Sequence, residues 1–251
     1  MFSKIKICNA FGIPVYLDFS LIILLVLFVT SSGSFAYGLS FALMLALSIV
    51  AHELGHALTA RAFGYRTRDI TLSLLGGCAS LIALPRKAWQ EFLTAIAGPA
   101  VSFTISGLSF LAIEFAPIRD AWTANMLVYA MWMNLMLGAF NLLPGFPMDG
   151  GRVFRSIASV FTTRAKATYA AMVVGRVFAV LLGLRGLHSM ATGGGWGFIS
   201  ILIAWMIWRE GWREYQMARM EESVRGWGDW SARVSPPPYG GSGDEVEIRE
   251  D

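Results

Sequence analysis

The sequence predicts an all-α polytopic membrane protein with about six transmembrane helices and a small membrane-associated β-hairpin. Of its 251 residues, 55% are hydrophobic and only 15% are charged, against about 25% charged residues in an ordinary soluble domain. Long apolar runs recur along the chain, and lysine and arginine gather in alternate segments between these runs. A soluble or disordered chain is disfavoured, because so little charge would leave large apolar patches in water.

Six apolar runs mark the predicted spans. They cover residues 17–31, 36–60, 90–115, 123–143, 168–187 and 196–208. A membrane-crossing helix needs about 20 apolar residues, so the first and last runs are short. A signal peptide cleaved near residues 34–36 is an alternative for the first run, but Asp18 beside the apolar core favours retention of that run.

The basic residues predict the orientation. With the N-terminus inside, all lysines and arginines except Arg119, Arg176 and Arg185 fall in the inner segments. Cytoplasmic loops carry such an excess, so both termini are predicted to be cytoplasmic. The pattern suits a multi-pass protein of a prokaryotic plasma membrane, with the lipid bilayer as its surroundings. The basic residues do not gather on one face, so no nucleic-acid partner is expected.

The composition changes after residue 208. Residues 1–208 are predicted to form the transmembrane core. Residues 209–251 are predicted to form a cytoplasmic amphipathic segment and a flexible acidic tail. Mixed charges favour a surface helix over 209–224, and three prolines, a glycine-rich stretch and several acids follow it.

Residues 67–84 favour β-structure between the second and third runs. Gly76-Gly77 lies between two β-favouring stretches, which predicts a two-residue hairpin turn there. Two interpretations stay open. One is an ordinary cytoplasmic hairpin, and the other is an edge strand that captures an extended peptide by β-addition.

The second run contains the sequence His52-Glu53-Leu54-Gly55-His56. Histidines four positions apart lie on one face of a helix, so both imidazoles reach one metal ion, with the glutamate placed to act on a metal-bound water. Burying three ionisable groups in a membrane helix costs several kcal/mol unless a partner compensates. A divalent cation is therefore favoured over the alternative, in which the three groups only satisfy one another.

A third metal ligand must come from another segment, because catalytic zinc sites typically have three protein ligands. The predicted topology places Asp149 directly after the fourth run, on the same inner side as the histidines. Two prolines and three glycines surround Asp149, and a broken backbone at that depth is tolerated only around a cavity. A plain cytoplasmic turn explains the prolines and glycines but not the acid. The acids considered are Asp18, Asp69, Glu91, Glu114, Asp120 and Asp149, of which Glu114 and Asp120 are predicted on the outer side.

Three other polar residues lie in or beside the apolar runs. Glu91 is expected at the membrane interface. Asn134 is expected to form hydrogen bonds between helices. Arg176 lies about two turns inside the fifth run, which favours a cavity or an acidic partner beside it.

The motif at 52–56 and the segment Asn141…Pro144…Asp149-Gly150-Gly151 resemble the two signatures of the site-2 protease family, the intramembrane zinc metalloproteases. The resemblance covers about residues 10–208 and includes the hairpin and Ala97-Gly98-Pro99. The sequence departs from family members that carry PDZ or CBS domains, because the segments between and after the signatures are too short for them, and a minimal core is expected. The resemblance also implies one Zn²⁺ per chain, with a zinc-bound water as the nucleophile. The implied metal ligands are His52, His56 and Asp149. The implied general base is Glu53, and Asn141 would hold or polarise the substrate.

The activity implied by the resemblance is hydrolysis of a peptide bond in or near a transmembrane segment of a membrane-anchored protein, as in regulated intramembrane proteolysis. The alternative is a catalytically silent zinc-binding membrane protein of the same fold that binds partner helices. A metal transporter is disfavoured, because the outer halves of the runs are apolar. A regulatory membrane partner and a homo-oligomer stay open.

Overall fold

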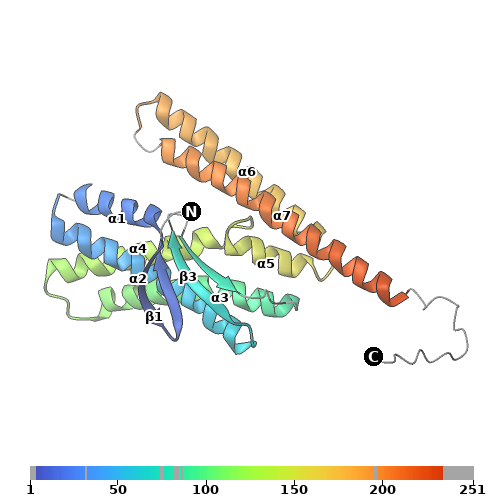
Figure 1. Cartoon of the computed structure of the whole chain (residues 1–251). Coiled ribbons are helices and arrows are strands. Elements are labelled where there is room, and N and C mark those ends of the chain that lie inside the picture. The colour runs from blue at the N-terminus through green and yellow to red at the C-terminus, as the bar shows by residue number, and fades with distance from the viewer. Residues whose placement is uncertain are drawn as a thin grey trace, which may run out of the picture.

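The computed structural model describes residues 4–31, 33–73, 76–81, 85, 87–194 and 197–233, and these residues are mostly helical (Figure 1). The strands form one small sheet, with the order β1-β2-β3-β4. In chain order the elements are β1 (Ile5–Ala10), β2 (Ile13–Leu17), α1 (Phe19–Ser31), α2 (Phe35–Ala62), β3 (Thr67–Ser73), β4 (Gly76–Leu81), α3 (Ala88–Phe115), α4 (Ala121–Asn141), α5 (Asp149–Ala158), α6 (Arg164–Ala191) and α7 (Gly197–Arg233).

An antiparallel hairpin of β1 and β2 precedes the first helix, and the sequence prediction did not include it. Ala10 pairs with Ile13, so Phe11 and Gly12 form a two-residue turn. Both turn residues have positive φ, 51° and 82°, which is typical of hairpin turns whose twist matches that of the strands. Gly12 was the available signal for this turn.

The predicted hairpin at 67–84 is confirmed, but the predicted position of its turn is wrong. Ser73 pairs with Gly76 and Leu72 pairs with Gly77, so both glycines lie inside β4. The connecting residues 74–75 lie outside the described residues. Strands β2 and β3 pair in parallel. Strand β4 comes last in the order of the described sheet, so it lies at one edge.

An apolar core joins the sheet to α1 and α2. Its members come from alternate positions of β2 and β3, from the start of α1 and from the C-terminal half of α2. They are Ile13, Val15, Leu21, Ile49, Ala57, Ile70 and Leu72. Alternation puts every second side chain of a strand on the same face, so one face of the sheet packs against the helix that carries His52 and His56.

Three described helices combine the length and apolar composition that a membrane span requires: α2, α3 and α6, each of 28 residues. The predicted runs 36–60, 90–115 and 168–187 therefore correspond to candidate spans. Large apolar side chains on these helices face outwards, including Leu47 (68% exposed), Leu108 (61%) and Leu181 (58%). Surfaces of this kind suit lipid rather than water. The other predicted runs correspond to α1, α4 and the start of α7.

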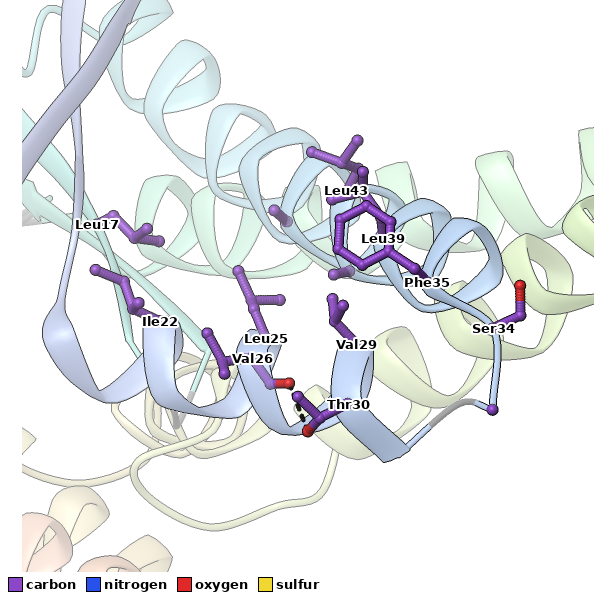
Figure 2. A pocket seen from close by; sticks show the side chains of 13 residues that line it. Leu17, Ile22, Leu25, Val26, Val29, Thr30, Ser34, Phe35, Leu39 and Leu43 are labelled. Atoms are coloured by element: carbon purple, nitrogen blue, oxygen red, sulfur yellow. Dashed lines mark hydrogen bonds between the residues drawn. The ribbon is translucent and has the colours of Figure 1, made fainter.

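An apolar groove of about 740 Å³ lies between α1 and α2. Figure 2 shows Leu25 and Val29 of α1 facing the side of α2 that carries Leu39 and Leu43. The hydroxyl of Thr30 donates to the carbonyl of Val26 and so offers little polarity to the groove. The groove therefore suits lipid chains or apolar side chains of another helix.

Helices α6 and α7 pack side by side and project from the bundle of α1 to α4 (Figure 1). Helix α7 runs from Gly197 to Arg233 without interruption, so the helix predicted over 209–224 is confirmed. The predicted division of the chain at residue 208 stays a prediction. The predicted acidic tail from residue 234 onwards lies outside the described residues.

Candidate metal centre

Helix α2 presents both histidines of the 52–56 motif on one buried face. The ring centroids of His52 and His56 are 4.9 Å apart, as expected for residues one helical turn apart. The two residues are 2% and 3% exposed, and Glu53 between them is 6% exposed. The motif is therefore an interior feature of the bundle.

Helix α3 orients both imidazole rings. Nδ1–H of His56 donates to the carbonyl oxygen of Thr94 at 2.7 Å. A carbonyl only accepts hydrogen bonds, so Nδ1 carries the proton and Nε2 is left with a free lone pair when the ring is neutral. Nδ1 of His52 lies 2.9 Å from Oγ of Ser102. Such contacts typically fix the ring orientation of histidines that bind metal.

Asp149, the first residue of α5, completes the group. Its Oδ2 lies 3.1 Å from Nε2 of His52 and 3.0 Å from Nε2 of His56. The chain between α4 and α5 folds back tightly, and a Cβ on Gly150 would lie 2.2 Å from the carbonyl oxygen of Leu143. Glycine at 150 therefore allows the close approach that carries Asp149 to the histidines.

The electrostatic surroundings keep Asp149 ionised. Burial alone would raise the pKa of this carboxyl, but the charge of His56 and hydrogen bonds from both histidines lower the pKa well below its usual range. Nη1 of Arg152 lies 4.0 Å from Oδ1, the oxygen that is not shared with the imidazoles, and adds to the lowering. A carboxylate in this state is an anionic ligand.

The three residues fit a divalent cation. Their ligand atoms lie within 4.8 Å of one another, and imidazole nitrogen with carboxylate oxygen is a donor set that zinc prefers. Gly98 of α3 keeps the space beside the donors open, because a Cβ there would lie 2.2 Å from Nε2 of His56 and 2.7 Å from Nε2 of His52. The site is therefore shaped by the absence of a side chain at residue 98.

The structure brings together His52, His56 and Asp149 as the sequence predicted, and it places Glu53 on the same buried segment. Asn141, at the end of α4, donates from Nδ2 to the carbonyl oxygen of Leu137 at 2.9 Å. Within the described part of the chain, no hydrogen bond joins Asn141 to the three clustered residues. The roles of His52, His56 and Asp149 as metal ligands, and the catalytic roles of Glu53 and Asn141, stay predictions.

Glu91, expected at the membrane interface, lies inside the protein, and its depth relative to the membrane stays a prediction. Glu91 is 1% exposed and is paired with Arg155 and Arg164. Sequence reasoning did not single out either arginine. The available signal was an acid at the start of an apolar run, which needs a base on the same side of the membrane.

The other two polar residues have separate outcomes. Asn134 of α4 donates from Nδ2 to Oγ of Ser48 in α2 at 2.9 Å, so the predicted hydrogen bond between helices is confirmed. Arg176 lies over the ring of Trp208 at 4.5 Å. It forms no ion pair with an acid among the described residues and contacts an aromatic ring instead, and the alternative of a cavity beside it stays a prediction.

The chain is similar to known proteins in both sequence and fold. The sequence model of peptidase family M50 matches residues 40–119 and 113–182. The solved structure of a site-2 protease from Methanocaldococcus jannaschii superimposes with a TM-score of 0.66 and 33% sequence identity, and covers 85% of this chain and 95% of that one.

Curated relatives include a protein of Synechocystis sp. whose name assigns it provisionally to the zinc metalloproteases. It is 35% identical over all of this chain and 69% of its own length. A zinc metalloprotease of Methanocaldococcus jannaschii is 36% identical over 74% of this chain. The chain spans about half of that second relative, 55% of its length.

Proposed function

The chain belongs to peptidase family M50, the family of the site-2 proteases, and from this premise we propose that it is an intramembrane zinc metalloendopeptidase. Its substrate is a membrane-anchored protein, cut at a peptide bond in or near a transmembrane segment. One observation supports the proposal most directly. Oδ2 of Asp149 lies 3.1 Å from Nε2 of His52 and 3.0 Å from Nε2 of His56. Asp149 lies 97 positions from His52 and 93 positions from His56 in the chain.

His52, His56 and Asp149 would hold one zinc ion. When bound, zinc lowers the pKa of a coordinated water to about 7 and polarises a carbonyl group. The histidines each contribute Nε2, because Nδ1 of each ring is engaged by α3. Asp149 contributes a carboxylate oxygen, since its Oδ2 lies 3.1 and 3.0 Å from the two Nε2 atoms.

Glu53 serves as the general base in this proposal. Its carboxylate accepts a proton from the attacking water and delivers that proton to the amine of the departing chain. The side chain is nearly buried, beside the two histidines in the chain, so bulk water competes little with this transfer.

Asn141 serves to hold the substrate carbonyl. Its amide nitrogen carries two hydrogens, and one of them is used by the carbonyl of Leu137. The second hydrogen remains to donate to the carbonyl oxygen of the bond that is cut. Such a bond strengthens as negative charge develops on that oxygen.

The substrate must present an extended segment, because a helix hides its own carbonyl groups in hydrogen bonds. The edge position of β4, with α2 packed beside it, supports capture of that segment by β-addition, since pairing with an edge strand replaces the lost hydrogen bonds. The apolar groove between α1 and α2 supports an approach through lipid (Figure 2).

Three candidate spans and membrane-protein relatives make this chain an integral membrane protein. We extend this to six spans, with α1, α4 and the start of α7 as the remaining three. Both termini lie in the cytoplasm of a prokaryotic cell, on the side where the basic residues gather. The metal centre then lies near the inner leaflet.

The test is a Glu53→Gln variant, expressed together with a candidate membrane-anchored substrate. The variant is expected to keep its zinc, because Glu53 is not a ligand, and to cleave at least about 100-fold more slowly. The control is Glu222→Gln, far along α7. Wild-type cleavage by Glu53→Gln would remove the proposed base, and wild-type protein with bound zinc and no cleavage of any tested substrate would favour the silent zinc-binding alternative.

A further inference from the structure

A buried ion pair joins the helix beside the histidines to the helix that carries Asp149. Oε1 of Glu91 in α3 accepts from Nε of Arg155 in α5 at 2.9 Å and also from Nη2 of Arg155. Glu91 is 1% exposed and Arg155 is 2% exposed. Charged residues are almost never buried so completely unless they are paired.

Further contacts fix both members of the pair. Nη1 of Arg164 donates to Oε2 of Glu91 at 2.7 Å, so both carboxylate oxygens are engaged. Nη1 of Arg155 donates to Glu214 of α7 at 3.0 Å. The guanidinium of Arg155 also lies over the ring of Phe146, 4.9 Å from its centroid, in the loop that leads to Asp149.

Helix α3 places Glu91 in line with the groups that surround the histidines. Glu91, Thr94, Gly98 and Ser102 are all buried, and their spacing of three and four residues puts them on one face of the helix. Thr94 and Ser102 contact the Nδ1 atoms of His56 and His52. Gly98 lies against both Nε2 atoms. The face of α3 that orients the imidazoles therefore begins at Glu91.

The spacing of the metal centre depends on α3. Helix α3 packs against both α2 and α5, the helices that supply the histidines and the aspartate. Arg155 follows Asp149 by six residues, about 9 Å along α5. A shift between α3 and α5 would therefore change the distance from Asp149 Oδ2 to the two imidazoles.

The structure assigns Glu91 and Arg155 as positioning residues of the metal centre: their ion pair sets the distance between α3 and α5 at which Asp149 meets both histidines. This inference rests on the proposed function, because it concerns the same zinc site. Among the hydrogen bonds and ion pairs of the described residues, none joins Glu91 or Arg155 to the three clustered side chains, so both act through Thr94, Phe146 and the helices that carry them.

The test measures zinc affinity by chelator competition on purified full-length protein in detergent. Glu91→Gln and Arg155→Gln are each expected to lower zinc affinity about 10–100-fold, the loss typical when groups that orient ligands are removed. The double variant is expected to lose no more than either single variant, because the two residues act as one unit. The matched control is Glu221→Gln, which weakens a half-exposed ion pair with Arg164 in the same network and is expected to leave zinc affinity unchanged.

A second readout separates positioning from mere stability. The absorption spectrum of Co²⁺-loaded protein reports the coordination geometry, and it is expected to change in Glu91→Gln but not in Glu221→Gln. Arg155→Lys keeps the charge and loses the forked contact, and it is expected to bind zinc with intermediate affinity. This variant provides the test if the glutamine variants do not fold.

The outcomes distinguish the two claims. If wild-type protein binds zinc and the Glu91 and Arg155 variants bind zinc equally well with an unchanged Co²⁺ spectrum, the positioning role is wrong and the proposed function stands. Reduced folding stability with unchanged zinc affinity leads to the same conclusion. If wild-type protein binds no zinc at all, both claims are wrong.

Discussion

Gly98 of α3 lies directly against His56 of α2. A Cβ on residue 98 would lie 2.2 Å from Nε2 and 2.5 Å from Cε1 of the imidazole. These separations are far shorter than van der Waals contact, so an alanine at this position would force the ring to move. The nitrogen nearest to Gly98 is the one that faces Asp149. The smallest side chain is therefore required where the metal ligands converge.

Gly98→Ala is predicted to abolish tight zinc binding, with a loss of affinity of at least about 100-fold, the upper end for changes beside metal ligands. The added methyl group displaces His56 Nε2 and also approaches His52 Nε2. Metal analysis and chelator competition measure the effect. Gly107→Ala is the matched control on the same helix, because a Cβ there meets no atom within 4 Å. Equal zinc binding by both alanine variants would contradict the prediction.

Removing a proposed ligand is predicted to empty the site. Asp149→Ala leaves two imidazoles, and His56→Ala leaves one imidazole and the carboxylate. Neither remaining set matches the three protein ligands of a typical catalytic zinc site. Bound zinc per chain is expected to fall from about one to near zero in each variant, measured by elemental analysis after dialysis. His188→Ala serves as the control, since this third histidine is exposed in α6. Full zinc content in Asp149→Ala would remove Asp149 from the ligand set.

The sequence predicted that His52 and His56 lie together because the geometry of this pair is local. A spacing of four residues on one helix fixes how His52 and His56 face each other. Asp149 was found by its predicted position on the inner side of the membrane, and by the resemblance of its segment to a family signature. Apolar runs predicted α2, α3 and α6, because a span of lipid-facing side chains is continuous in the sequence.

The parts that the sequence did not predict depend on packing between distant segments. Burial of Glu91 depends on Arg155, 64 residues away, and no local pattern encodes which base meets which acid. The acceptor for His56 is the backbone carbonyl of Thr94, which any residue type would supply. The β1–β2 hairpin was missed because Gly12 alone is a weak turn signal, and because β2 completes its pairing with the distant strand β3, where Val15 pairs with Ile70.

Ser102→Ala is predicted to weaken zinc binding about 10-fold without emptying the site. The serine hydroxyl lies 2.9 Å from Nδ1 of His52, and its loss frees the ring to rotate. Ser106→Ala is the control one turn further along α3, because its hydroxyl donates to Met131 of α4 instead. Chelator competition compares the two variants. If they bind zinc with equal affinity, Ser102 does not orient His52.

Asn134→Leu is predicted to lower the stability of the bundle while leaving zinc binding intact. Nδ2 of Asn134 joins α4 to α2 through Oγ of Ser48 at 2.9 Å, one turn before His52. Hydrogen bonds between membrane helices contribute on average about 0.6 kcal/mol and at most about 1.7 kcal/mol, so the expected loss lies in this range. Denaturant unfolding in detergent measures the loss of free energy of unfolding. Ser40→Ala is the control, because the hydroxyl of Ser40 donates within its own helix, to the carbonyl oxygen of Ala36. A change in zinc affinity in Asn134→Leu would show instead that the contact between α2 and α4 also sets the position of His52.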